Sequence, residues 1–262
     1  MPLTAFQKEV LRAIAKNRKP ESHIAGGAAI NRAEGGPRFS GDIDIFHDEA
    51  VRVAAYADLD AEALTTHGCS VEWKTRSLGF HQARVTKGND AVRLDWVADS
   101  SFRFFPVQID EEFGFCLHTA DLATNKLLAF ATRIVARDFI DVLLLDQTYL
   151  SLGAIIWAAC GKDPGLTPGL LLNLADRHSR FRAEDFEEVI LAQPLDLREL
   201  KQRWLAAKER AERLIDALPE EELGCLYLDA DRNPVTPDPA APGFASLVRH
   251  FGSVRGAWPT IS

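Results

Sequence analysis

Asp42 and Asp44 are the residues whose type and spacing are best suited to chemistry. They alternate with Ile43, Ile45 and Phe46, which predicts a β-strand with both carboxylates on one face. Two carboxylates that close cannot both ionise without cost unless a cation lies between them. Mg²⁺ meets that need, because it binds carboxylate oxygens, keeps several waters and bridges to substrate phosphates. The pair predicts a metal site for phosphoryl chemistry, although an Asp-x-Asp pair alone also occurs on ordinary solvated strands.

The residues just before this pair make the prediction more specific. Gly26 and Gly27 follow a short apolar segment and open a predicted helix. Backbone N–H groups can approach a triphosphate there without a side chain in the way. Arg38 and Ser40 stand immediately ahead of the two acids. We expect Gly26, Gly27, Arg38 and Ser40 to line the nucleotide-binding part of the same site.

Asp95 is predicted to be the third acid of this site. Two-metal phosphoryl transfer uses a further acid on a neighbouring strand, which holds a second ion and takes the proton of the acceptor. In the strand that contains Asp95, the apolar Leu94 and Trp96 face one way and Asp95 faces the other. Asp95 can therefore join Asp42 and Asp44 as a metal ligand and catalytic residue. An acid on a solvated strand is the simpler alternative.

A second cluster of charged residues follows in a helical part of the chain: Lys126, Arg133, Arg137, Asp138 and Asp141. On one continuous helix, Lys126, Arg133 and Asp141 would share a face with Arg137, whereas a break near Val135 would change that. Cations aimed at a triphosphate stabilise the charge that develops during phosphoryl transfer. We favour this catalytic role for Lys126. For Arg133 taken alone, a salt-bridged helix surface is the preferred interpretation.

Other reactive side chains are expected to be structural. His47 directly follows the acidic strand, but a lone histidine is more often a core or surface residue than a catalyst. Trp73, Trp96 and Trp157 are most simply core residues, although an exposed aromatic near the site could stack on a base. The four cysteines are scattered without paired spacing, which indicates buried free thiols.

The elements that must position these residues change in kind near residue 118. Before it, period-two segments predict three strands, at 70–76, 80–86 and 91–97. From residue 119 the pattern is helical, with the strongest apolar stripe between Leu195 and Leu218. The pattern also predicts a helix over Ala183–Leu191, a hairpin joining 226–228 to 234–235, and a final helix over Phe244–Phe251. We predict two domains, 1–118 as the catalytic core and 119–262 as a mainly helical domain that completes its cleft.

Composition bounds the class of protein. The 262 residues are 47% hydrophobic and 26% charged, which is typical of a globular protein. The formal net charge of −8 argues against broad coating of nucleic acid, though not against a local basic groove. The sequence shows neither a membrane-spanning run nor an apolar signal block, so we expect a cytoplasmic protein without a membrane partner.

Taken together, three segments resemble the AbiEii/AbiGii toxin family of nucleotidyltransferases. They are 26–30 with its double glycine, 38–46 with Arg-x-Ser-x-Asp-Ile-Asp-Ile-Phe, and 121–145 with its lysine and Arg-Asp-x-x-Asp. The resemblance covers roughly the first 150 residues. It implies an α+β fold, in which a polymerase-beta-like core with a mixed sheet precedes a helical C-terminal bundle. It also implies Mg²⁺ or Mn²⁺, a nucleoside triphosphate substrate, and action as the toxin of a type IV-like toxin–antitoxin or phage-defence system.

The resemblance also implies roles for individual residues. Asp42 and Asp44 would hold metal, Gly26 and Gly27 would shape the phosphate loop, and Lys126 would contact the triphosphate. The later acidic motif is matched by two residues, Asp138 and Asp141, and the sequence leaves open which of them enters the site. Because some family members modify the acceptor end of tRNA, RNA is the expected acceptor, with a cognate antitoxin as a possible partner.

One departure from the family pattern keeps alternatives open. Ala28 stands where relatives usually place Ser or Thr, so a hydroxyl that would bind phosphate is missing. A catalytically weak homologue that binds nucleotide without turnover is therefore one alternative. A nucleotidyltransferase that modifies a small molecule, such as an antibiotic, is another.

Overall fold

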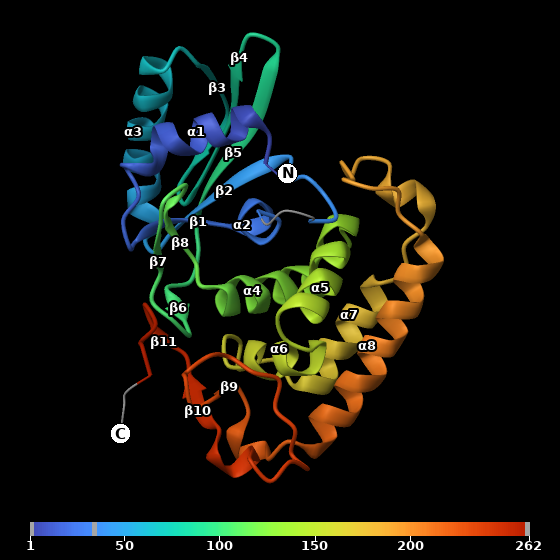
Figure 1. The fold of residues 1–262 in the computed structure, drawn as a ribbon. Coiled ribbons are helices and arrows are strands. Elements are labelled where there is room, and N and C mark those ends of the chain that lie inside the picture. The colour runs from blue at the N-terminus through green and yellow to red at the C-terminus, as the bar shows by residue number, and fades with distance from the viewer. Residues whose placement is uncertain (1–2, 33–35, 260–262) are drawn as a thin grey trace. The chain divides into compact units, whose positions relative to one another are not determined.

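The computed structural model describes residues 3–32 and 36–259, and the chain forms two compact units (Figure 1). The first unit runs to residue 101 and includes 106–118 and 190–192. The second contains 102–105, 119–189 and the chain from 193 onward. The roles predicted for the two halves, a catalytic core and a helical domain that completes its cleft, stay predictions.

The first unit is built on a seven-stranded mixed sheet with the strand order β3-β4-β5-β2-β1-β8-β7. Its strands are β1 (Ser22–Ala25), β2 (Asp42–His47), β3 (Ser70–Ser77), β4 (Phe80–Lys87), β5 (Asp90–Ala98), β7 (Gln108–Asp110) and β8 (Gly114–Cys116). The central strand β2 runs parallel to β5 and antiparallel to β1. The meander β3-β4-β5 lies where the alternating segments predicted it. The predicted α+β class with a mixed sheet is confirmed.

Two helices cover one face of this sheet, and the acidic residues lie on the other. Helices α1 (Ala5–Ala15) and α3 (Val53–Thr66) pack against β5, where Leu94 and Trp96 are fully buried (Figure 1). Because side chains alternate along a strand, burying Leu94 and Trp96 turns Asp95 to the opposite face. One face of the sheet is therefore polar. The opposite face, which α1 and α3 cover, is apolar and is called the dry face below.

A buried ion pair joins the helices to the sheet on the dry side. The side chains of Arg18 and Asp60 are both fully buried and lie 2.5 Å apart. Asp60 also accepts hydrogen bonds from Asn17 at 2.9 Å and from the indole of Trp96 at 2.8 Å. Burial raises the pKa of Asp60 above its ordinary value, although Arg18 and these donors stabilise its charge. These contacts thereby fix the segment that follows α1, the middle of α3 and strand β5 to one another.

The second unit is mainly helical. Its helices are α4 (Thr119–Thr132), α5 (Ala136–Thr148), α6 (Leu152–Ala159), α7 (Pro168–His178) and α8 (Leu197–Ala217), and its short strands are β6 (Phe102–Arg103), β9 (Cys225–Leu228), β10 (Val248–Phe251) and β11 (Ser253–Val254). The apolar stripe predicted for α8 is buried at Leu200, Trp204, Ala207 and Ala211. Asp121, in the first turn of α4, accepts hydrogen bonds from the backbone N–H groups of Phe104 and Phe105, at 2.9 and 3.1 Å. This contact binds the 102–105 segment to the helical unit.

Two of the predicted helices are wrong. In the helix predicted over Ala183–Leu191, only a 3-10 turn, Ala183–Phe186, forms, and Leu191 makes an isolated β-bridge with Arg38 instead. The predicted final helix is a 3-10 turn followed by β10, which pairs with β9. Helical patterns of eight or nine residues are marginal by themselves, so an available strand partner overrides them. The predicted hairpin turn does form, with a bridge between Leu228 and Pro234.

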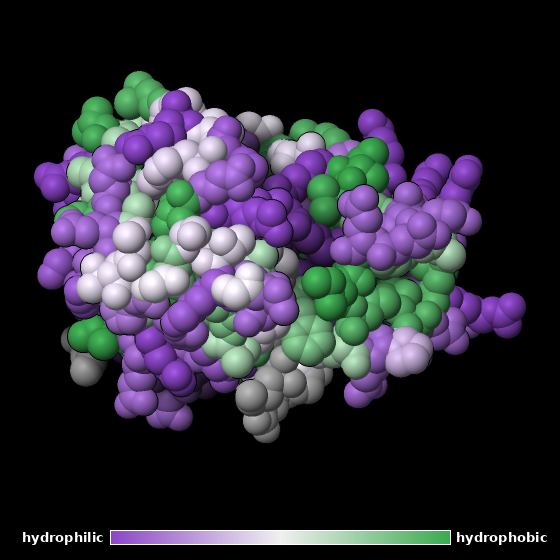
Figure 2. Space-filling model, turned by 90° about the horizontal axis from the view of Figure 1, so that it is seen from above, coloured by the Kyte–Doolittle hydropathy of each residue, from purple (hydrophilic) through white to green (hydrophobic). Residues whose placement is uncertain are grey.

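Polar side chains cover most of the face shown in Figure 2, and hydrophobic ones form separate patches. All four cysteines are free and buried, as predicted. None of the described helices is by itself long and apolar enough to span a membrane. Helices α5 and α6 meet the length and composition together, but they are bent by 110° at their junction.

We predict that Asp60→Ala destabilises the protein by about 3–5 kcal/mol, because it leaves the buried Arg18 without its counter-ion. Urea denaturation measures this loss. Asp58→Ala is the matched control, since Asp58 lies on the same helix in an exposed pair with Arg76, and should cost less than about 1 kcal/mol. Equal losses of unfolding free energy in the two variants would show that the buried pair stabilises the fold no more than the exposed pair does.

Candidate active site

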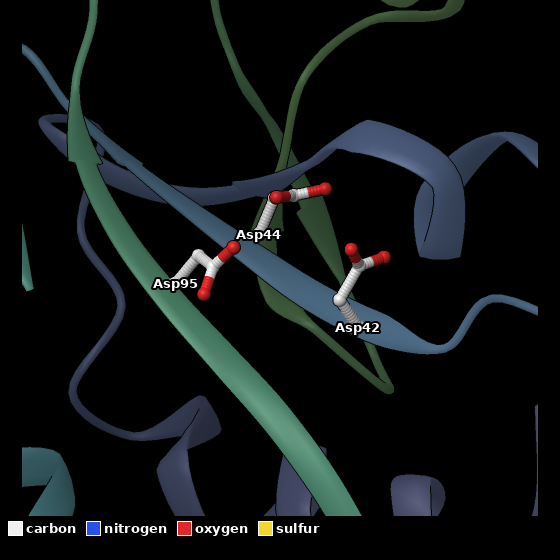
Figure 3. A group of neighbouring side chains, drawn as sticks. All are labelled: Asp42, Asp44 and Asp95. Carbon is white, nitrogen blue, oxygen red and sulfur yellow. The ribbon is translucent and has the colours of Figure 1, made fainter. Parts of the chain in front are cut away.

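Three carboxylates meet on the polar face of the sheet. Ligand oxygens of Asp42, Asp44 and Asp95 all lie within 4.8 Å of one another (Figure 3). The strand register produces this cluster, because Asp44 on β2 is the direct neighbour of Asp95 on β5. Like charges directly opposite on neighbouring strands are destabilising. An arrangement of this kind is stable when a cation or several hydrogen bonds offset the repulsion.

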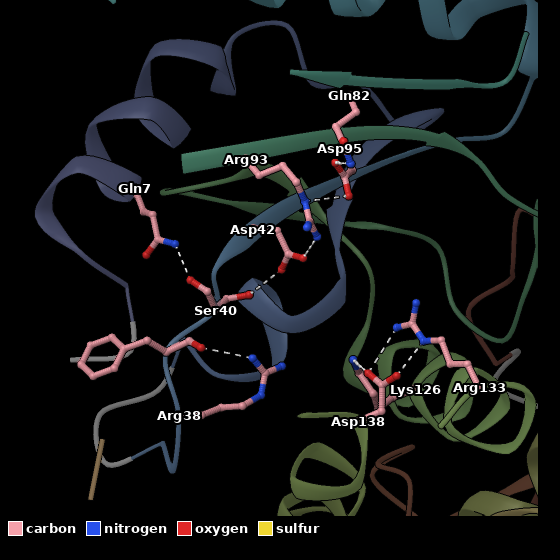
Figure 4. Close-up of polar contacts among 11 residues, drawn as sticks. Gln7, Arg38, Ser40, Asp42, Gln82, Arg93, Asp95, Lys126, Arg133 and Asp138 are labelled. Atoms are coloured by element: carbon pink, nitrogen blue, oxygen red, sulfur yellow. Dashed lines mark hydrogen bonds and ion pairs between the residues drawn. The ribbon is translucent and has the colours of Figure 1, made fainter. Parts of the chain in front are cut away.

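Hydrogen bonds from neighbouring side chains hold Asp42 and Asp95 in place. The hydroxyl of Ser40 donates to Asp42 Oδ1 at 3.1 Å, and the amide of Gln82 donates to Asp95 Oδ1 at 2.9 Å (Figure 4). Arg93 pairs with Asp42, and its Nε lies 3.2 Å from Asp95 Oδ2. Neither Gln82 nor Arg93 was predicted as part of the site. Each lies two residues before another polar residue on its strand, Gln82 before Arg84 and Arg93 before Asp95. This spacing is common on strand surfaces, so it did not mark either residue as part of the site.

The double glycine leaves room for the acids. Gly26 has φ +67°, in the left-handed region that favours glycine, and begins α2 (Gly26–Ile30). A Cβ at Gly26 would lie 1.8 Å from Asp44 Oδ2. A Cβ at Gly27 would lie 2.6 Å from Arg38 Nη2 and 2.9 Å from Ser40 Oγ. The two glycines therefore make space for side chains of the site, and their role as a phosphate cradle stays a prediction.

The segment that carries Arg38 and Ser40 is fixed from two sides. In the first turn of α1, the side chain of Gln7 accepts a hydrogen bond from Thr4 N and donates one to Ser40 O at 2.5 Å. The extended residues 190–192 bridge to Arg38 and accept from Phe39 N at 2.8 Å through Ile190 O. Arg38 and Ser40 are each only 2% exposed. Ser40 is therefore held in a fixed position, from which its hydroxyl donates a hydrogen bond to Asp42.

The donor set fits a hard divalent cation. Three carboxylates supply oxygen ligands only, and within residues 3–32 and 36–259 no cysteine or histidine joins the cluster of Asp42, Asp44 and Asp95. Oxygen-only sites with negative charge suit Mg²⁺ and Mn²⁺ better than softer metals. The role of these residues as metal ligands remains a prediction, which the geometry supports.

The structure joins Lys126, Arg133, Asp138 and Asp141 of the second predicted cluster in a network of ion pairs. Lys126 on α4 lies 2.8 Å from Asp138 and 3.0 Å from Asp141, both on α5 and both fully buried. Arg133 lies 2.7 Å from Asp138 through its Nε. Burial opposes the ionisation of Asp138, but the charges of Lys126 and Arg133 outweigh it, and the pKa of Asp138 lies below its usual range. The four charges sum to zero.

This network differs from the single helical face considered for these residues. Helix α4 ends at Thr132 and α5 begins at Ala136, so the helix is interrupted near Val135. Lys126 is 7% exposed and both of its carboxylate partners are buried, whereas the Arg133 side chain is 49% exposed. Of these two cations, Arg133 is the one whose side chain reaches solvent. The predicted contact of Lys126 with a triphosphate stays a prediction.

His47 is a core residue, which was the simpler expectation. It is 1% exposed, and its ring lies 5.2 Å from that of Tyr56. Neither ring nitrogen has a hydrogen-bond partner among the described residues. Burial, together with the charge of Arg18, lowers the pKa of His47 to about 3.

This shift predicts acid sensitivity. The folded state takes up the His47 proton only near pH 3, whereas an unfolded chain takes it up near pH 6.5, so the unfolded state binds more protons in between. The contribution of His47 to the free energy of unfolding should be fully present above pH 6.5. It should fall on acidification below that pH, by up to about 1.4 kcal/mol per pH unit. Urea unfolding between pH 7 and 4 tests this, with His47→Leu expected to show a shallower slope. Parallel curves for the two proteins would contradict it.

We predict that Gly26→Ala destabilises the protein by at least about 1–2 kcal/mol, from the left-handed backbone alone, and displaces Asp44 in addition. Gly41→Ala is the control, because a Cβ at Gly41 meets nothing within 4 Å. Its unfolding free energy should stay within about 0.5 kcal/mol of wild type in urea titrations. A Gly26→Ala protein as stable as Gly41→Ala would refute the steric argument.

Solved structures share this fold. A proposed nucleotidyltransferase from H. pylori has 20% sequence identity and a TM-score of 0.51, covering 82% of this chain and 98% of that one. MenT4, a nucleotidyltransferase toxin from Mycobacterium tuberculosis H37Rv, has 15% identity and a TM-score of 0.56, covering 82% and 83%. A search of curated protein sequences finds no significant match.

A family-level comparison covers most of the chain. The sequence model described as "Nucleotidyl transferase AbiEii toxin, Type IV TA system" matches residues 10–223. This span includes the glycine pair, the three acids and the Lys126 network. The predicted family is confirmed: the chain belongs to the AbiEii family of nucleotidyltransferase toxins and is an enzyme of that class.

Proposed function

We propose that the protein transfers a nucleoside monophosphate from a nucleoside triphosphate to RNA, with tRNA as the first acceptor to test, and depends on Mg²⁺ or Mn²⁺. The observation that carries this proposal is the cluster of Asp42, Asp44 and Asp95 on adjacent strands, with oxygens within 4.8 Å. A site of this charge, built on rigid strands beside a glycine pair, suits a metal–triphosphate complex.

The residues divide the work of the reaction. Divalent ions bound by the three acids would offset the charge of the triphosphate and polarise its α-phosphate. Ser40 keeps Asp42 oriented, and Gln82 does the same for Asp95. Asp95 would then accept the proton of the acceptor hydroxyl as that oxygen attacks the α-phosphorus and pyrophosphate leaves. Backbone N–H groups at Gly26 and Gly27 would contact the phosphates.

The charges around the acids favour an anionic acceptor. Arg93 lies beside the cluster with 41% of its side chain exposed, and the exposed Arg84 is its register neighbour on β4. Once divalent ions offset the three carboxylates, these cations would leave the face positively charged, which attracts a phosphate backbone and repels a cationic antibiotic. This arrangement supports RNA over an aminoglycoside-like acceptor. Family membership further supports action in the cytoplasm under the control of a cognate antitoxin.

The alanine at position 28 gives little support to an inactive homologue. Its side chain is fully buried, so a hydroxyl at this position would not be exposed to solvent. The missing hydroxyl therefore removes no group from the accessible surface. We propose that backbone amides perform the phosphate contact.

We predict that Asp44→Asn lowers transfer of label from α-³²P-labelled triphosphates to total RNA by at least about 100-fold, because it removes a metal ligand, and even outer partners of such ligands contribute 10–100-fold. The assay tests each of the four nucleotides in turn with Mg²⁺ or Mn²⁺. Asp58→Asn, which changes an exposed carboxylate on α3, should retain wild-type transfer.

The outcomes separate the alternatives. Full activity of Asp44→Asn would refute the metal site. Label in a small-molecule fraction, with none in RNA, would refute the acceptor and keep the chemistry. Nucleotide binding by calorimetry without any labelled product would favour the homologue that lacks turnover.

A further inference from the structure

Arg93 is placed where its charge meets two of the three acids. It lies on β5 two residues before Asp95 and is the register neighbour of Asp42 on β2. Its guanidinium pairs with Asp42 through Nη2, and its Nε lies 3.2 Å from Asp95 Oδ2 (Figure 4). The side chain comes from the same strand face as the acids, so no other element has to move to bring it there.

The formal charges show what Arg93 does to the cluster. Asp42, Asp44 and Asp95 carry three negative charges, and Arg93 supplies one positive charge within contact distance of two of them. A guanidinium in this position offsets part of the repulsion that a divalent ion would otherwise offset. Arg93 and a divalent ion therefore compete for the same negative charge.

Asp42 is the residue over which they compete. Its Oδ1 accepts a hydrogen bond from the hydroxyl of Ser40, and its Oδ2 forms an ion pair with Arg93. Ser40 is 2% exposed and held by Gln7, so it is not free to withdraw. The Arg93 side chain is 41% exposed, so it has room to turn toward solvent and is the partner that can leave Asp42. Its Nε, close to Asp95 but outside hydrogen-bond geometry, is held less firmly.

We propose that Arg93 is a built-in counter-ion of the acidic cluster, which holds Asp42 in the absence of metal and withdraws from it when a divalent cation binds. This inference rests on the proposed metal site. Arg93 then sets the threshold of metal concentration at which the site forms. It is a positioning residue, because it acts through Asp42 and not on the substrate.

The test measures metal binding alone, without substrate. Calorimetric titration with Mn²⁺ should show that Arg93→Met binds the ion about 10-fold more tightly than wild type or better, because the competing charge is gone. In EDTA, the thermal midpoint of Arg93→Met should fall below that of wild type, and added Mn²⁺ should raise it by more. Arg93→Lys, which keeps the charge but cannot bridge two carboxylates, should lie between the two.

Arg84→Met is the matched control. It removes the same charge from the same sheet face, one strand farther from the acids. Its affinity for Mn²⁺ should stay within about twofold of wild type, since solvent and salt weaken the interaction of an exposed side chain with the acids. A gain equal to that of Arg93→Met would overturn a specific role of Arg93 and leave only a general field effect.

Two further results separate this inference from the proposed function. If wild type binds Mn²⁺ and Arg93→Met binds it equally or more weakly, the counter-ion role is wrong and the metal site stands. If neither protein binds Mn²⁺, or if adding Asp44→Asn to Arg93→Met leaves binding intact, the metal site itself is wrong. Circular dichroism confirms the fold of each variant, and Arg93→Gln replaces Arg93→Met if the latter does not fold.

Discussion

Repulsion between carboxylates on two parallel strands is the constraint around which the first unit is built. Asp44 and Asp95 are register neighbours, with Asp42 beside them. At a separation of about 5 Å and the effective dielectric constant of a protein surface, each pair of charges repels by about 3 kcal/mol. Strands hold the three groups at fixed positions, so the repulsion cannot relax by local rearrangement. The neighbouring donors, Ser40 and Gln82, and the cation Arg93 each offset part of it.

The charges on the two faces of β5 are arranged differently: like charges gather around Asp95 on one face, and opposite charges pair on the other. On the polar face, Asp95 needs cations or donors from its neighbours. On the dry face, Trp96 donates to Asp60, whose charge is matched by Arg18 in a fully buried pair. The buried pair costs desolvation, and in return it fixes α1 and α3 to the strand that carries Asp95. A strand fixed in this way holds like charges together more firmly than a loop would.

Local patterns in the sequence were sufficient to predict strands β2, β3, β4 and β5 and the direction in which their acids point. Alternation around Ile43 and Leu94 placed Asp42, Asp44 and Asp95 on one face, because side-chain direction along a strand depends only on position. Their mutual contact required the parallel pairing of β2 with β5, which alternation suggests but does not fix.

Contacts that depend on tertiary structure could not be predicted in the same way. The pairing of Arg93 with Asp42 follows from strand register, and the clamp of Ile190 on Phe39 joins segments far apart in the sequence. Residues 248–251 form strand β10 by pairing with β9, and a local pattern, which contains no information on this partner, predicted a helix instead. The burial of Lys126 reflects a helix break near Val135 and the partners that it brings together, which a continuous helical wheel would not reveal.

The clamp at residues 190–192 also bears on the order of events during synthesis. The segment bridging to Arg38 is made long after the sheet that carries the acids, because Leu191 follows Arg38 by 153 residues. A chain leaving the ribosome can therefore pair β2 with β5 early but completes the Arg38 loop only once residue 192 of 262 has emerged. Translation itself thus delays the assembly of the finished site until residues 190–192 have been made.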